Sequence, residues 1–188
     1  MRYCRRHSWL FVLAVLWLLI AAPVAVLAGG VEVRKGALVA SEKGYFLEAE
    51  FEIALTRTLE EALSKGVPLY FLLEFELIRP RWYWIDEQIA DSRQQFRLSF
   101  NSLTRQYRVA VGALYQNFAT RREAMGFLSK VRVGEIAGTE SLSKGTSYIA
   151  GVRLRLDDAQ LPRPFQVSAV GSRQWSVSSD WFRWTVTP

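Results

Sequence analysis

Alternation of apolar and polar residues runs through most of the chain after residue 30 and predicts β-strands. From Tyr45 to Leu55 apolar side chains occupy every second position, and three glutamates, at positions 48, 50 and 52, lie between them. A period of two residues is typical of a strand with one face in the core and the other in water. The same reasoning predicts strands over residues 31–39, 69–78, 96–100, 107–111, 148–156, 165–170 and 181–186.

Short turn sequences between these segments favour antiparallel pairing. Residues 41–44 (Ser-Glu-Lys-Gly) and the pair Asn101-Ser102 each separate two predicted strands, so each is expected to close a hairpin. The segment 69–78 is apolar on both faces, which predicts a central strand. The predicted fold is mainly β: an antiparallel β-sandwich, immunoglobulin-like in general architecture, with two short helices.

The two helices are expected where the chain repeats the pattern Thr-x-x-Glu-Ala-Leu/Met. The pattern occurs at 58–63 and again at 120–125. In each, the threonine can cap the helix while the glutamate reaches back to the amide of the cap. The recurrence, 62 residues apart, is either a degenerate internal repeat or the coincidence of two common capping boxes.

The N-terminal segment has the features of an export signal. Three arginines, Arg2, Arg5 and Arg6, precede an apolar run from Trp9 to Leu27, and small residues around Ala28 suit cleavage. Residues 1–28 are therefore expected to be a signal peptide, followed by one β-rich domain over 29–188. The alternative is an uncleaved inner-membrane anchor formed by residues 9–27, because this run is long enough to span a bilayer. Either way, the domain is expected to be periplasmic.

Cleavage would leave a chain without histidine or cysteine, because His7 and Cys4 both lie in the predicted signal. This excludes nucleophilic sites that need an imidazole or a thiol, and also disulfides. The net charge would fall from +6 to +3, with 12 acids and 7 bases in residues 29–92 and 6 acids and 14 bases in residues 93–188. Cross-strand ion pairs between the two halves explain this split better than an anionic partner does.

Catalytic and ligand-binding motifs are scarce. Glycosidase chemistry needs two carboxyl groups, and the pair Asp86-Glu87 could supply one while Glu74 or Glu76 supplies the other. However, glutamates that alternate along strands are typical of a solvated sheet face. The pair Asp157-Asp158 lacks the other oxygen ligands of a calcium loop. No catalytic, metal or cofactor site is therefore predicted.

Two segments rich in arginine and aromatic residues, 79–84 and 172–184, are more distinctive. They contain all five tryptophans outside the predicted signal. Indole and guanidinium groups form good binding surfaces when exposed, whereas inward-pointing indoles would belong to the core. Nucleic acid is not expected for an exported protein. The candidate binding residues are Arg79, Arg81, Trp82, Trp84, Arg173, Trp175, Trp181, Arg183 and Trp184.

The same segments carry a family resemblance. The ending Trp175–Trp184, the stretch Leu161–Pro164 and the segment Arg79–Trp84 resemble a family of exported bacterial proteins catalogued only as a domain of unknown function. Members are often encoded beside a membrane sensor kinase of the nitrogen-regulation type. The resemblance covers essentially all of residues 29–188 and implies an accessory role in envelope sensing. It assigns no catalytic or ligand-binding residue.

The sequence thus favours a non-catalytic periplasmic interaction module that binds an envelope or membrane protein, such as a sensor kinase. The first alternative is a domain that binds an envelope glycan or lipid through exposed tryptophan and arginine. The second is a hydrolase that uses carboxylates alone. A protein-binding module should expose an apolar patch or an unpaired strand edge, a glycan binder two coplanar indoles, and a hydrolase two converging carboxyls.

Overall fold

The structure is a computed structural model that describes residues 29–42, 44–83, 85–138, 142–163, 165–166, 172 and 174–188. The predicted signal peptide lies outside these residues. Within the part that the structure describes, every helix is too short or too polar to cross a bilayer.

The smaller of two antiparallel sheets has the strand order β1-β2-β7. Strands β1 (Gly30–Ser41) and β2 (Gly44–Ala54) form the hairpin predicted at residues 41–44. Strand β7 (Lys130–Ala137) pairs with the other side of β2. This third strand was not predicted, although Val131 and Val133 alternate with charged residues in its first half.

The larger sheet has the order β6-β5-β4-β3-β8-β9, and all its strand pairs are antiparallel. The predicted central strand 69–78 is indeed interior, paired with β4 on one side and β8 on the other. The bounds are β3 Leu69–Arg79, β4 Glu87–Asn101, β5 Gln106–Val111, β6 Leu114–Phe118, β8 Tyr148–Leu156 and β9 Phe182–Val186.

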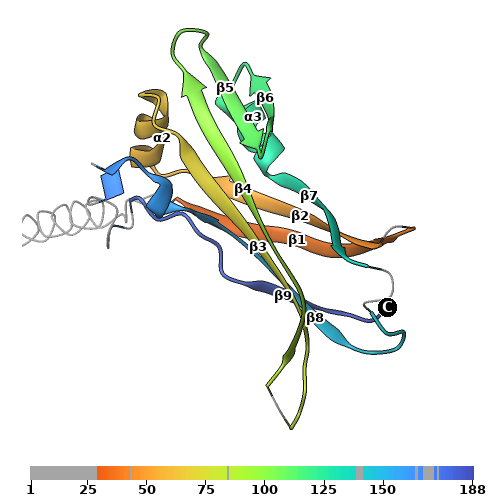
Figure 1. Cartoon of the computed structure of the whole chain (residues 1–188). Helices are drawn as coiled ribbons and strands as arrows, with labels where there is room; N and C mark the ends of the chain where they lie inside the picture. Colours follow the sequence, from red (N-terminus) through yellow and green to blue (C-terminus); the bar gives the residue numbers. More distant parts are fainter. Residues whose placement is uncertain are drawn as a thin grey trace, which may run out of the picture.

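Both sheets contribute to one hydrophobic core. Leu47 and Phe51 of β2 belong to the same buried cluster as Phe71 of β3, Leu98 of β4 and Val152 of β8. In Figure 1 strands β1 and β2 run across the strands of the larger sheet, with the core between the two layers. The predicted antiparallel β-sandwich is therefore confirmed; its immunoglobulin-like character stays a prediction.

Both predicted helices are present, α2 (Arg57–Ser64) and α3 (Arg121–Leu128), together with a short 3-10 helix, η2 (Asp158–Gln160). Thr120 caps α3 as predicted, accepting a hydrogen bond from the Glu123 amide at 3.2 Å. The expected cap Thr58 of α2 is wrong: Thr56 caps this helix and Thr58 lies in its first turn.

The strand predicted over residues 165–170 is wrong at the two of its residues that the structure describes. Phe165 and Gln166 donate backbone hydrogen bonds to the carbonyl of Pro162 and are helical, so the predicted strand 165–170 does not begin there. Residues 167–170 lie outside the described part.

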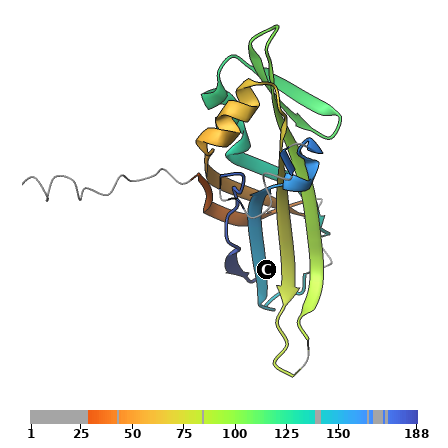
Figure 2. The same cartoon turned by 90° about the vertical axis from the view of Figure 1, so that its left-hand side faces the viewer.

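The hairpin of β3 and β4 shapes one end of the molecule. Figure 2 shows its closed end projecting beyond the neighbouring strands, at the opposite end from α2 and α3. Strand β4 extends over 15 residues, of which only 96–100 were predicted. This long hairpin carries the first of the two arginine- and aromatic-rich segments.

Candidate binding surfaces

The closed end of the β3–β4 hairpin, residues 80–86, carries exposed apolar side chains; we call it the β3–β4 tip. Trp82 is 95% exposed, Ile85 80% and Tyr83 67%. The rings of Trp82 and Tyr83 meet edge to face, with centroids 5.2 Å apart. Exposed apolar clusters of this kind mark interaction sites in soluble proteins. Trp84, also predicted to bind, lies outside the described residues.

The predicted arginines brace the base of this tip. Arg79 and Arg81 both form ion pairs with Glu87, the latter at 2.6 Å. The backbone amide of Arg81 also donates to Asp86 Oδ1 at 3.1 Å. A hydrogen bond from Arg81 and the charges of both arginines lower the pKa of Glu87 below its ordinary value. These contacts join the two strands at the base of the tip.

Strand β4 has an unpaired edge next to the tip. Its pairing with β3 runs from Glu87 to Leu98, but its pairing with β5 begins only at Phe96. In the described part of the chain, no strand pairs with this side of β4 between Glu87 and Gln95. The exposed tip and the unpaired edge are thus continuous along one hairpin.

The second arginine- and aromatic-rich segment contributes to the outer face of the larger sheet. The ring of Trp181 lies 4.7 Å from the Arg153 guanidinium carbon and 5.4 Å from that of Arg183. Arg183 in turn forms a 3.0 Å ion pair with Glu76. Gly151 allows this packing, because a Cβ there would lie 3.3 Å from Trp181 and 3.0 Å from Glu76.

Glu74 lies on the same face and gathers three arginines. Its Oε2 accepts from Arg153 at 2.6 Å and from Arg155 at 3.2 Å, while Arg93 lies 4.0 Å from Oε1. These pairs, with Glu76–Arg183, confirm the predicted ion pairing between the acidic and basic halves of the chain.

The electrostatics of Glu74 differ from those of a general acid. Its burial raises the pKa of the carboxyl, but the hydrogen bonds and charges of Arg153 and Arg155 outweigh that effect. The net pKa lies below the ordinary value. A glycosidase acid needs a raised pKa, so Glu74 does not suit that role.

Two of the predicted tryptophans point into the protein. Trp175 is 8% exposed and packs on Phe165, with ring centroids 5.3 Å apart. Trp184 is half-buried between the sheets, near Phe75 and Phe182. Among the tryptophans that the structure describes, Trp82 alone is exposed. Arg173 lies outside the described residues. The described members of the predicted set lie at the tip, on the outer face and in the core, so they do not form one continuous surface.

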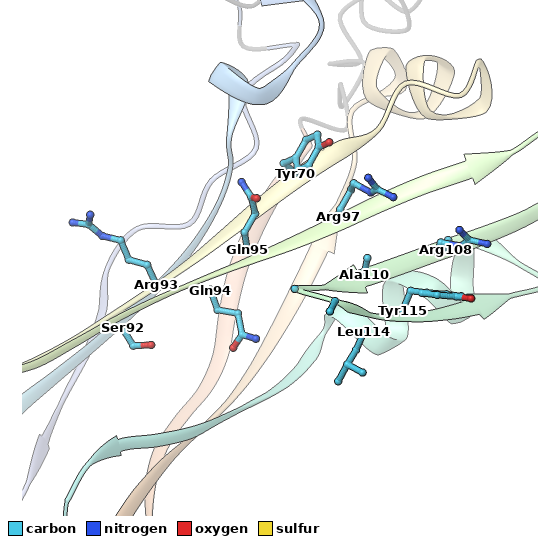
Figure 3. A pocket seen from close by; sticks show the side chains of 12 residues that line it. Tyr70, Ser92, Arg93, Gln94, Gln95, Arg97, Arg108, Ala110, Leu114 and Tyr115 are labelled. Carbon is cyan, nitrogen blue, oxygen red and sulfur yellow. The ribbon is translucent and has the colours of Figure 1, made fainter.

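An open groove that the sequence did not indicate lies beside β4 where β5 and β6 end, and side chains from both faces of β4 line it (Figure 3). Its volume is about 620 Å³, and its lining includes Tyr70, Arg97, Arg108 and Tyr115. These residues come from four different strands. Only the strand register brings them together, so no sequence motif predicts the groove.

Comparison with known proteins gives a family but no characterised relative. No curated protein and no solved structure matches the chain. The model of the family described as Domain of unknown function (DUF4390) matches residues 28–185. This match spans the whole β-sandwich that the structure describes, apart from the last few residues. The chain therefore belongs to the DUF4390 family.

Proposed function

We propose that this protein is a non-catalytic interaction module of the bacterial envelope, which binds a membrane protein through its β3–β4 tip. The observation that carries the proposal is the exposure of Trp82, Tyr83 and Ile85 at the end of a braced hairpin. Contact between such large apolar side chains and water is unfavourable, so covering them with a partner lowers the free energy of the complex. Tryptophan and tyrosine are also the residues that dominate binding energy in protein interfaces.

A protein partner fits this hairpin better than a charged surface does. Arg79 and Arg81 are paired with Glu87, and Asp86 adds a second acid, so the tip carries no net charge. The unpaired edge of β4 beside it offers backbone donors and acceptors that a protein segment can satisfy. The tip thus supplies apolar contact and the edge supplies hydrogen bonds.

We propose that the domain works in the periplasm, a setting that the N-terminal residues and the family resemblance support. Residues 1–28 act as an export signal, or residues 9–27 remain as an anchor, and either places the domain in the periplasm. The partner is an integral membrane protein of the sensor-kinase type or another envelope complex with a periplasmic surface.

The test compares capture of membrane proteins by tagged wild type and by a tip variant after crosslinking in cells. The variant combines Trp82→Ser, Tyr83→Ser and Ile85→Ser. The matched control is Leu103→Ser, because Leu103 is 92% exposed at the tip of the β4–β5 hairpin. We expect the tip variant to lose a membrane protein that both the wild type and the control capture. Equal capture by all three proteins would refute the proposal.

A second candidate uses the same tip at a lipid surface. Trp and Tyr favour the membrane–water interface, and the exposed Trp82–Tyr83 pair has this composition. Flotation of the purified protein with phosphatidylcholine vesicles tests this candidate. If flotation depends on the tip residues and no protein partner is captured, the lipid surface is the binding partner of the tip in place of a membrane protein.

A further inference from the structure

The groove beside β4 exists because two neighbouring strands end at different places. The β5–β6 hairpin turns at Gly112 and Ala113, whereas β4 continues past it to Glu87. Gly112 has φ +58°, a conformation that suits glycine in a tight turn. The hairpin therefore leaves a notch beside β4, and Gly112 and Ala113, which line it, are too small to fill it.

The strand register then places large polar side chains around this notch. Tyr70, Arg97, Ala110 and Tyr115 form one row across β3, β4, β5 and β6. The small side chain of Ala110 leaves the space between Arg97 and Tyr115 open. Arg108 lies two residues before Ala110 on β5, on the same face, so it is a diagonal neighbour of Arg97. Figure 3 shows the side chains of Tyr70, Arg97, Arg108 and Tyr115 along the groove.

Of the arginines that line the groove, Arg93 is paired with Glu74, whereas Arg97 and Arg108 form no ion pair with a described residue. Arg108 stacks on Tyr115, with its guanidinium carbon 4.4 Å from the ring centroid, and its Nε donates to the neutral amide of Asn117 at 2.9 Å. In the part of the chain that the structure describes, Arg97 forms no ion pair, and no carboxylate lines the groove. Two acids contact other lining residues: Asp157 accepts from Gln95 at 3.4 Å, and Glu74 lies 4.0 Å from Arg93.

We propose that this groove binds a small phosphate-bearing ligand, with the phosphate between the guanidinium groups of Arg97 and Arg108. Arginine suits phosphate because its planar donors form paired, charge-assisted hydrogen bonds. The stacked position of Arg108 on Tyr115 limits the freedom that this side chain loses on binding. Tyr70 and Gln95 supply neutral hydrogen-bonding groups for the rest of the ligand. The groove contains no residue of the β3–β4 tip, but its lining includes residues 92–95 of the unpaired β4 edge. The phosphate proposal rests on Arg97 and Arg108 and does not depend on the function proposed for the tip.

Calorimetric titration with inorganic pyrophosphate at constant ionic strength tests the proposal directly. We expect Arg97→Gln to weaken binding by about tenfold or more, as the loss of one charge-assisted contact predicts. Arg108→Gln should have a similar effect. The matched control is Arg57→Gln, which removes the same charge from a side chain that is 92% exposed on α2. This control should leave binding within about twofold of wild type.

A second arm separates a soluble phosphate from a lipid headgroup. Vesicles of phosphatidylcholine with and without phosphatidylglycerol are floated with wild type, Arg97→Gln and Arg57→Gln. Binding only to phosphatidylglycerol vesicles, lost in Arg97→Gln, would assign the phosphate to a lipid headgroup and still support the site. Two results overturn the proposal: no binding of either probe by the wild type, or binding that Arg97→Gln and Arg57→Gln weaken equally.

Discussion

Gly36 of β1 lies directly against the indole of Trp184, and this contact leaves no room for a side chain. A Cβ at Gly36 would lie 2.7 Å from Trp184 Cζ3, closer than real Cβ contacts allow. We predict that Gly36→Ala lowers the free energy of unfolding by about 1–3 kcal/mol, because overpacking displaces the ring from the core. Urea denaturation measures this change.

Gly30→Ala is the control for this prediction, because a Cβ at Gly30, in the same strand, meets nothing within 4 Å. It should leave stability within about 0.5 kcal/mol of wild type. Equal denaturation midpoints for the two variants would show that Trp184 does not pack on Gly36.

Glu74 makes stability depend on pH in a definite direction. Its folded-state pKa lies below the ordinary 4.5, so its contribution is fully present above that value and is lost as the pH falls through the folded-state pKa. We predict that wild type loses stability between about pH 5 and pH 3 more steeply than Glu74→Gln does. Urea denaturation at a series of pH values measures both slopes.

Glu50→Gln serves as the control for Glu74, because Glu50 is exposed on β2. This variant should keep the wild-type slope. If the Glu74→Gln slope matched that of wild type, the arginines around Glu74 would not be holding it ionised.

At the scale of elements, the two helix caps give a clear test. Thr56 Oγ1 accepts from the Leu59 amide at 3.3 Å, so Thr56→Ala should cost about 1–2 kcal/mol. Thr58→Ala should cost less than about 0.5 kcal/mol, because Thr58 lies inside α2. Free energies of unfolding decide between them, and a larger loss for Thr58→Ala would restore the cap expected from the sequence.

The elements that the sequence predicts best are those with one apolar and one polar face. Strand β2 matches its prediction within a residue or so because its inner side chains pack in the core while its glutamates face water. The first half of β4, from Glu87 to Gln95, has no comparable pattern, because its side chains there are largely polar on both faces. The short edge strand β6 is mostly exposed and likewise gives no apolar period. Pairing with neighbours, rather than local pattern, makes these segments strands.

At the scale of the whole molecule, the sequence predicted the sandwich but only part of the candidate sites. The segment 79–84 stood out by composition, and the structure places its described apolar residues at an exposed tip. The tryptophans of the second segment divide between the core, with Trp175 and Trp184, and the outer face, with Trp181. Only Trp184 lies in a strand, so no alternating pattern could predict the sides of the other two. The groove required the register of four strands, which no local pattern contains.

Burial separates the tryptophans that stabilise the fold from the one that is free to bind among the described residues. Trp175→Ala should cost about 3–5 kcal/mol, because it removes a buried indole. Trp82→Ala should leave the free energy of unfolding within about 0.5 kcal/mol of wild type, since Trp82 contributes little buried area. Urea denaturation of the two variants checks this contrast, and a comparable loss in Trp82→Ala would place that indole in the fold rather than at a binding surface.

The most direct test of the central claim is site-specific photo-crosslinking in living cells. A photoreactive amino acid replaces Tyr83 at the β3–β4 tip in one strain and Leu103 at the β4–β5 tip in another. Both positions are exposed hairpin residues, and Leu103 is the more exposed of the two, so greater accessibility cannot explain a crosslink formed only from position 83. We predict a crosslink from position 83 to one membrane protein and none to that protein from position 103. The same adducts from both positions, or no adduct from position 83, would contradict it.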